Sequence, residues 1–271
     1  MKRYVVLNKE IGQTPLSCME AWREKNNLAP DISLTYAGRL DPMASGKLLV
    51  LIGEECKKKE TYLHLDKEYE FEILFGLASD TQDVLGRLTT SDPILFDTRV
   101  ITQTLQTLVG NIALPYPHFS SKTVQGKPLH TWTLENKLDE ITIPTQTSII
   151  YALKLLETHI QTRKEVYDYT TKKIETIPPV TELRKALGND FRREDVRADW
   201  NQFLAEGNKT DPFYRAKIQC IASSGTYMRS LAALIAARLG TTGLAYSIHR
   251  TKIGTYKKIP IIGGLWTSMY T

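Results

Sequence analysis

The 271-residue sequence has little cysteine: Cys18, Cys56 and Cys220 are its only three. Their number is odd and their spacing matches no metal-binding motif, which argues against a disulfide framework and against a cysteine-based zinc site. We therefore expect reduced thiols, a cytoplasmic protein and no bound metal.

Long apolar runs are also missing. No stretch approaches the ~18 apolar residues that span a bilayer, and residues 4–7, which follow Lys2 and Arg3, are too short for a signal peptide. We expect no membrane association. What the chain has is 42% hydrophobic residues, enough for the core of one large mixed domain, and a net charge of +5. That charge permits a nucleic-acid partner without requiring one.

Residues 34–53 read LTYAGRLDPMASGKLLVLIG and are the most unusual stretch of the chain. Gly38 and Gly46 can adopt backbone conformations that other residues avoid. Between them, Asp41-Pro42 is a turn-forming dipeptide, and residues 48–52 form a short apolar run typical of a buried strand. Two interpretations are open at this point: an ordinary turn before a strand, or a carboxylate held for chemistry on a stiff loop.

Periodicity predicts the elements around this stretch. Residues 4–7 indicate a strand, and Thr14 followed by Pro15 predicts the start of a helix that runs to about residue 25. Alternating apolar residues predict strands at 66–76, 149–158 and 216–221, and helical spacing is found at 93–109, 183–187, 191–204 and 231–239.

Two segments carry unusual charge. Residues 76–86, GLASDTQDVLG, predict a turn in which Asp80 and Asp83 bond backbone groups, because two isolated carboxylates are a weak metal-ligand set. Residues 161–211 are rich in charges of both signs and are flanked by predicted strands. We interpret them as an insertion, a small helical subdomain with a solvated surface that can be removed without unfolding the protein.

The string YAGRLDPMASGKLLVLIGEECKK resembles the central motif of the TruB family of RNA pseudouridine synthases, in which the aspartate of an L-D-P triplet is catalytic. That aspartate matches Asp41. Lys67-Glu68-Tyr69 resembles the family's K/R-x-Y, whose tyrosine lies against the target base, although a core tyrosine fits the alternating strand equally well. The string SSGTYMRSL resembles C-x-x-G-T-Y-[IV]-R-[ST]-L and matches Tyr227 and Arg229.

The resemblance also implies substrate-binding residues. Lys9 belongs to a segment similar to the family's K-x-x-G-x-T/S, and Gly38 and Arg39 precede the catalytic triplet. Tyr36 stands where the family has the histidine of G-H-T-G, and we expect it to act as an aromatic wedge when the base leaves its stack. In GLAYSIHRTKIG, which resembles G-A-x-x-x-x-L-R-R-T-x-x-G, Ile248 replaces a leucine and Arg250 is retained.

Residues 112–146 contain PYPHFSSKTVQGKPLHTW, which resembles a family segment that forms a mobile RNA-binding lobe. Lys122 is expected to bind RNA there, Lys127 and His130 can also meet phosphates, and Tyr116 and Phe119 offer stacking surfaces.

By this resemblance the chain is one catalytic domain over residues 1–271, without a recognisable C-terminal PUA domain. Its fold class would be α/β (α+β), the pseudouridine synthase fold, with a mixed, largely antiparallel sheet, flanking helices and a central RNA-binding cleft. Its activity would be isomerisation of the T-loop uridine (position 55) of tRNA, with the T-arm stem-loop as partner, no cofactor and a monomeric state.

The chemistry needs a nucleophile and a route for the C5 proton. Asp41 would be the nucleophile and Arg229 would keep it ionised. Tyr69 would stack on the base. Attack at C6, attack at C1′ and a glycal route all remain open. Two other functions are alternatives: a non-catalytic RNA-binding or tRNA-folding protein, and a guide-RNA-dependent relative. The joint presence of a carboxylate, tyrosine and arginine disfavours the first, and the lack of a further C-terminal domain disfavours the second.

Overall fold

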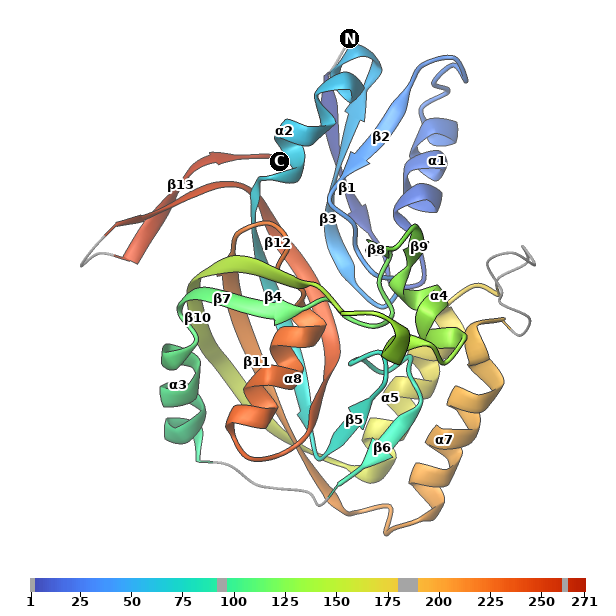
Figure 1. Cartoon of the computed structure of the whole chain (residues 1–271), viewed down its shortest axis with the longest axis vertical. Coiled ribbons are helices and arrows are strands. Elements are labelled where there is room, and N and C mark those ends of the chain that lie inside the picture. The colour runs from blue at the N-terminus through green and yellow to red at the C-terminus, as the bar shows by residue number, and fades with distance from the viewer. Residues whose placement is uncertain (1–2, 92–96, 180–189, 260–262) are drawn as a thin grey trace.

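A nine-stranded, largely antiparallel sheet forms the centre of the protein (Figure 1). The computed structural model describes residues 3–91, 97–179, 190–259 and 263–271. Along the sheet the strands are β1 (Tyr4–Lys9), β3 (Ser45–Ile52), β12 (Gly243–Ile259), β4 (Asp66–Phe75), β11 (Pro212–Ala222), β10 (Thr145–Thr162) and β7 (Gly110–Pro115), with β2 (Leu34–Ala37) beside β3 and β13 (Gly263–Met269) beside β12. The expected mixed, largely antiparallel sheet is therefore confirmed.

Two parts of this sheet join at one short parallel contact. Ser45 and Gly46, at the start of β3, pair with His249 and Arg250 in the middle of β12. On one side of this junction lie β1, β2 and β3, and on the other lie the long antiparallel strands. The chain reaches the junction through the loop that carries Asp41, so the loop lies where the two parts meet.

Helices pack against the sheet (Figure 1). Helix α1 packs beside β1 and β2, while α3 and α8 lie across the larger part of the sheet. The helices are α1 (Pro15–Lys25), α2 (Lys59–Leu63), α3 (Thr98–Thr107), α4 (Leu129–Leu134), α5 (Arg163–Thr176), α7 (Arg193–Ala205) and α8 (Met228–Arg238), with 3-10 turns η1 (Gly53–Lys58), η2 (Leu138–Glu140) and η3 (Asp190–Arg192). Short hairpins are β5 (Leu77–Ser79) with β6 (Leu88–Thr90), and β8 (Thr123–Val124) with β9 (Lys127–Pro128).

Local chemistry explains the first helix. Thr14 has extended backbone angles, and its side chain accepts a hydrogen bond from the Ser17 amide while Ser17 Oγ accepts from the Thr14 amide. This capping box satisfies two amides at the helix start, and Pro15 supplies a preset φ angle. The helix ends at Lys25, so both of its predicted ends are confirmed.

Other predicted elements differ from the observed ones at their ends. The strand expected at 149–158 is β10, which is longer and runs on to Thr162. The helix expected at 93–109 is α3, and residues 92–96 lie outside the described part. The helix expected at 183–187 lies entirely outside it, whereas the one expected at 191–204 is confirmed as α7.

The described residues of segment 161–211 pack against the sheet, which does not favour a separate subdomain, and whether the segment can be removed stays a prediction. Val166 of α5, and Trp200 and Phe203 of α7, are at most 1% exposed and belong to the main apolar cluster with the sheet. Trp200 Nε1 also donates to the Val84 carbonyl at 3.2 Å. Apolar residues at the four- and three-residue spacing 196, 200 and 203 give α7 a stripe that faces the core. Helices α5 and α7 thus contribute to the core.

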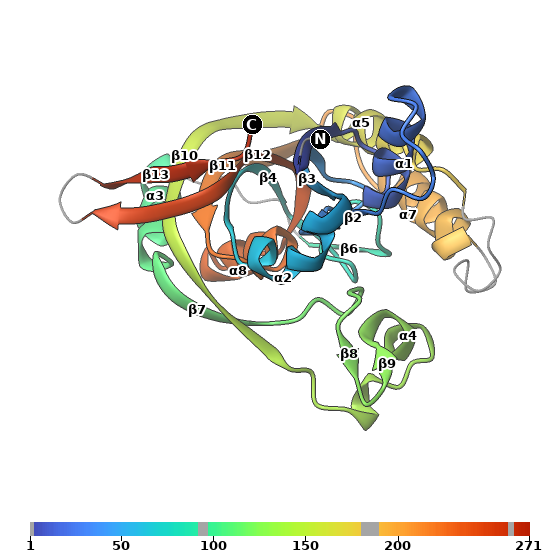
Figure 2. The same ribbon diagram turned by 90° about the horizontal axis from the view of Figure 1, so that it is seen from above.

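Residues 112–115 belong to β7 of the sheet. The residues that follow, with β8, β9 and α4, protrude from the rest of the chain, as Figure 2 shows. They pack on themselves: Leu129 and Trp132 are buried, and Trp132 Nε1 donates to the Val124 carbonyl at 3.1 Å. We refer to residues 112–146 as the lobe, and its mobility stays a prediction. Among the described residues, no helix is long and apolar enough to span a membrane.

Candidate active site

The Asp41 loop is a tight turn whose backbone conformation requires a glycine. Gly38 has a φ angle of +85°, a region that favours glycine. The Ala44 amide donates to the Asp41 carbonyl at 3.0 Å and closes the turn. Leu40 and Met43 point into the main apolar cluster, at 5% and 0% exposure. The turn thus anchors its apolar residues inside and presents the Asp41 side chain, which is 39% exposed.

Arg250 holds one side of this loop. Its side chain donates to the carbonyls of Lys47 at 2.6 Å and of Gly38 and Arg39 at 3.3 Å each. Arg250 is only 1% exposed. A side chain so buried, with its donors on backbone carbonyls, positions the loop. Its expected role in substrate binding stays a prediction.

Lys9 holds the other side. Its Nζ donates to the Ala44 carbonyl at 2.6 Å and to the Glu10 carbonyl at 3.0 Å, and the residue is fully buried. Burial lowers the pKa of Lys9 to about 8. Lys9 thus also positions the loop, and its contact with RNA stays a prediction. A further bond runs from the Gly12 amide to the Pro42 carbonyl at 2.9 Å.

Arg229 is the partner of Asp41, as the sequence predicted. Its Nε lies 2.8 Å from Asp41 Oδ2, and its side chain is only 5% exposed. The remaining nitrogens donate to the carbonyls of Thr81 at 2.7 Å and Phe119 at 3.3 Å. Three segments distant in sequence therefore fix the guanidinium, and the guanidinium fixes the direction of the Asp41 carboxylate.

Asp83 is a second carboxylate at this arginine, and the sequence analysis assigned it only to the turn. It does accept from the Leu85 amide and the Thr81 hydroxyl, as a turn residue would. However, its Oδ2 also lies 3.6 Å from Arg229 Nε. Burial raises the pKa of Asp83, and Arg229 opposes that rise. The D-T-x-D spacing was visible, but the contact depends on where α8 lies.

The charge of Arg229 is well supported. Burial alone would lower the pKa of Arg229, but Asp41 and Asp83 outweigh burial and raise it above its ordinary value. Arginine keeps its proton even when buried. The site therefore combines a permanent cation, an exposed carboxylate and a buried carboxylate.

Tyr69 and Ile248 are buried residues of the central sheet. Tyr69 of β4 is 9% exposed and Ile248 of β12 is 5% exposed. Both belong to the same cluster as Leu40 and Met43, the residues that flank Asp41. This packing satisfies the core-tyrosine interpretation, and the roles of Tyr69 and Ile248 toward the base stay predictions.

The lobe meets the site through aromatic and polar contacts. Tyr116 stacks edge-on with Tyr227, at the N-cap of α8, with ring centroids 5.6 Å apart. Burial first, and then Tyr116 and Asp41, raise the pKa of Tyr227. Arg39 donates to Ser121 Oγ at 2.7 Å, and Lys122 Nζ lies 5.0 Å from the Tyr116 ring centroid. Arg39 and Lys122 are both exposed.

Tyr36 is not grouped with these residues. It lies on β2 opposite Val50 and packs in a separate apolar cluster with Cys18 and Leu48. Lys59 Nζ lies 5.5 Å from its ring centroid. The cluster that contains Tyr69 does not include Tyr36, so a wedge role would require Tyr36 to leave this packing.

Several other expected or conceivable features lie elsewhere. Lys127 pairs with Glu135 at 2.5 Å and lies 3.6 Å from the Trp132 ring centroid, so its charge is used within the lobe.

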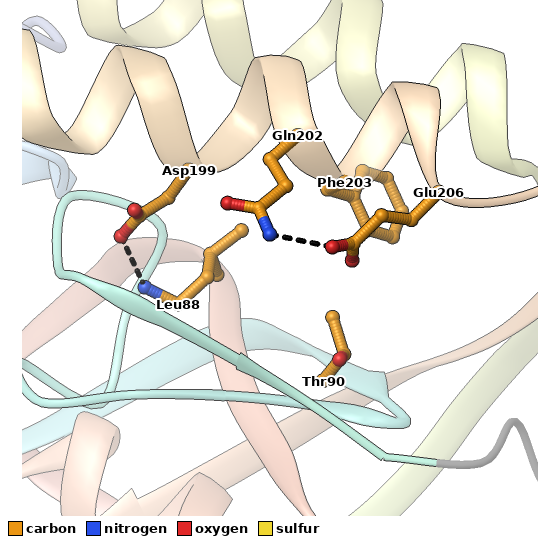
Figure 3. Close-up of a pocket in the computed structure, with 6 residues that line it drawn as sticks. All are labelled: Leu88, Thr90, Asp199, Gln202, Phe203 and Glu206. Carbon is orange, nitrogen blue, oxygen red and sulfur yellow. Dashed lines mark hydrogen bonds between the residues drawn. The ribbon is translucent and has the colours of Figure 1, made fainter.

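Within the described ranges, no group of histidine, cysteine, aspartate or glutamate residues could hold a metal ion. A small pocket of about 100 Å³ lies between α7 and β6 (Figure 3), and none of the predicted site residues lines it.

Comparisons with known proteins agree with this geometry. The family model "TruB family pseudouridylate synthase (N terminal domain)" matches residues 28–177, which include Asp41 and the lobe. Among curated proteins, "tRNA pseudouridine synthase B" of Caldicellulosiruptor saccharolyticus is 26% identical over 256 residues, 94% of this chain and 69% of that protein. The protein of the same name from Borreliella afzelii is 27% identical, over 94% of this chain and 70% of its own length.

A solved structure shows the same fold. The crystal structure of a Cbf5-Nop10-Gar1 complex aligns with 93% of this chain at a TM-score of 0.51 and 17% sequence identity. This chain spans only 48% of that one. At such low identity the match supports the architecture of the sheet and helices.

Proposed function

The chain belongs to the TruB family of pseudouridylate synthases, and on that premise we propose that it isomerises the T-loop uridine of tRNA to pseudouridine. The observation that carries the proposal is the 2.8 Å contact between the half-exposed Asp41 and the buried Arg229. The relatives named tRNA pseudouridine synthase B supply the substrate class.

The reaction makes modest demands on the protein. The N1–C1′ bond breaks, the base turns, a C5–C1′ bond forms, C5 loses a proton and N1 gains one. Electrons balance without an oxidant or reductant, so the residues of the chain suffice and we expect no cofactor. The required groups are a nucleophile, a support for its charge and an acceptor for the C5 proton.

Asp41 is the proposed nucleophile. A bound base excludes water from the site, and burial would favour the neutral carboxylic acid. The guanidinium of Arg229 opposes this effect, because it stays charged and directs its Nε–H at Asp41 Oδ2. Asp83 in turn orients Arg229 from behind. Whether Asp41 attacks C6 or C1′, or promotes a glycal, makes the same demand on this pair.

The target base must leave its stack to reach Asp41, at a cost of a few kcal/mol. Tyr69, which shares the main apolar cluster with Leu40 and Met43 of the loop, is the proposed surface for the flipped base and helps to move the C5 proton. Tyr36 is the proposed wedge, which must leave its present apolar packing to fill the gap.

The lobe offers the remaining RNA contacts. Arg39 on the Asp41 loop and Lys122 on the lobe are exposed cations, and Tyr116 of the lobe contacts Tyr227 at the start of α8. Cations that follow a backbone and aromatic rings that stack on bases are the usual combination at single-stranded RNA loops. The monomeric state and the cytoplasmic location also stay predictions.

The test is pseudouridine mapping on a tRNA transcript incubated with wild-type protein or Asp41→Asn. We expect modification of the T-loop uridine by the wild type and none by the variant, with RNA binding retained, because the substitution removes the nucleophile at nearly constant volume. Turnover by Asp41→Asn would refute the role of Asp41. Binding without modification by the wild type would favour the non-catalytic RNA-binding alternative.

A further inference from the structure

Arg192 lies where the core segment 161–211 meets the lobe. It is the last residue of η3 and caps α7 with a φ angle of +60°. Its guanidinium carbon lies 4.5 Å from the centroid of the Phe119 ring. Its Nη1 and Nη2 lie 2.5 and 3.3 Å from the Asp80 carboxylate. The side chain is 24% exposed.

Both partners of Arg192 are themselves fixed. Asp80 Oδ1 accepts from the Arg87 amide at 2.9 Å, which holds the carboxylate on the turn between β5 and β6. The carbonyl of Thr81, the next residue of that turn, accepts a hydrogen bond from Arg229. The carbonyl of Phe119 also accepts from Arg229. The two residues that Arg192 binds therefore belong to the two segments that hold Arg229.

We propose that Arg192 is a positioning residue that docks the lobe against the active site. Its planar guanidinium lies on the Phe119 ring while two of its nitrogens bind Asp80, so it joins the lobe to the turn. With Phe119 docked, the Phe119 carbonyl completes the set of acceptors around Arg229 and so supports the Asp41–Arg229 pair. The effect on turnover rests on the proposed function, whereas the docking itself does not.

Docking is tested first by hydrogen exchange of the lobe amides in RNA-free protein. Arg192→Ala removes an aromatic contact and a partly exposed ion pair, so the lobe should open more often. Because amide exchange follows the equilibrium between closed and open lobe, we expect exchange about tenfold faster in the variant. Arg197→Ala is the matched control, because Arg197 lies on the same helix and pairs with Glu175 at 2.8 Å. Unchanged lobe exchange in Arg192→Ala, or equal acceleration in both variants, would overturn the proposal.

Single-turnover kinetics then separate positioning from RNA binding. At saturating tRNA we expect Arg192→Ala and Phe119→Leu to slow the rate by about tenfold each, and the double variant to be no slower than either. Arg192→Lys should recover part of the rate, since it keeps the charge but loses the two-nitrogen contact.

Loss of affinity with an unchanged rate at saturation would make Arg192 an RNA contact and overturn its positioning role. If no form of the protein makes pseudouridine, the proposed function fails, and the exchange experiment still decides whether Arg192 docks the lobe.

Discussion

At the scale of single residues, the site depends on the several acceptors that the guanidinium of Arg229 contacts at once. Arg229 contacts Asp41, lies close to Asp83 and donates to two backbone carbonyls. A lysine has a charge of the same sign but no planar set of donors, so it cannot make all of these contacts at once. The arginine is needed for geometry as well as for charge.

Arg229→Lys tests this geometry. We expect the single-turnover rate to fall at least ~100-fold, or ~2.7 kcal/mol of transition-state stabilisation. RNA affinity should change much less, since one buried residue contributes little to the total phosphate interaction. Tritium release from C5-labelled tRNA and filter binding measure the two quantities. Collapse of affinity with an unchanged rate at saturation would show that Arg229 is an RNA contact.

Lys173 of α5 gives a prediction on stability and pH. It is 4% exposed, its Nζ donates to the Tyr246 carbonyl at 2.5 Å, and burial lowers its pKa from 10.5 to about 8. Between pH 8 and 10.5 the unfolded chain therefore binds more protons at this residue than the folded one, and folding gains stability as the pH rises. Below pH 8 both states are protonated and this contribution is constant.

Urea denaturation of the wild type and Lys173→Met at pH 7, 8.5 and 10 measures this contribution. We expect the stability of the wild type relative to the variant to increase across the two higher values. The comparison is needed because Lys9 and Lys67 also have pKa values lowered by burial to about 8. A constant difference between the two proteins would contradict the prediction.

The sequence predicted Asp41 and Arg229 because a resemblance names residues within contiguous motifs. It did not predict that Lys9 and Arg250 would be buried beneath the loop. Their partners are backbone carbonyls, and a carbonyl has no sequence signature. The contact of Asp83 with Arg229 was missed for a related reason, since the two residues are 146 positions apart and meet only in the folded chain.

At the scale of elements, strong periodicity and clear caps were sufficient. The alternation in β4 and the Thr14-Pro15 start of α1 predicted both elements closely. Helix α5 was missed because its buried residues are few, and one of them is Lys173. From sequence alone, a lysine predicts a solvent-exposed position. The burial of Lys173 is evident only in the structure, where its Nζ donates to the Tyr246 carbonyl.

Gly46 offers a test at this scale, because β3 and β12 approach closely there. A Cβ at this position would lie 2.3 Å from the Arg250 carbonyl oxygen and 2.7 Å from its nitrogen, and the φ angle is +104°. Gly46→Ala must therefore separate the strands or strain the backbone. We expect a loss of roughly 3 kcal/mol in unfolding free energy and a large loss of activity.

Gly53→Ala is the matched control for Gly46→Ala in chemical denaturation. Gly53 also has a positive φ, of +61°, but apart from Gly53 and its two chain neighbours, no atom of the described residues lies within 4 Å of a Cβ built there. Gly53→Ala should therefore lose only the free energy of placing alanine at a positive φ, about 1 kcal/mol. Equal destabilisation by the two substitutions would mean that the close approach of β3 to β12 contributes nothing.

At the scale of the whole molecule, segment 161–211 shows what sequence reasoning could not reach. Its many charges indicate a solvated surface, and charged pairs such as Arg197 with Glu175 do lie there. Its apolar minority, however, fills the core beneath the sheet. Whether a few apolar residues suffice to build a segment into the core depends on partners elsewhere in the chain. That the segment is an insertion relative to the family stays a prediction.

Deletion of residues 161–211, with the ends joined by a short turn, is expected to abolish the native fold. The deletion removes Val166, Trp200 and Phe203 together, and truncating one such aromatic residue to alanine already costs about 3–5 kcal/mol, a large part of a typical folding free energy. Thermal and urea unfolding of the deletion variant should show no cooperative transition. Trp200→Ala should retain the transition with that single cost, and Arg197→Ala should stay within about 0.5 kcal/mol of the wild type. A deletion variant that melts like the native protein would show that the sheet and α8 close the core without α5 and α7.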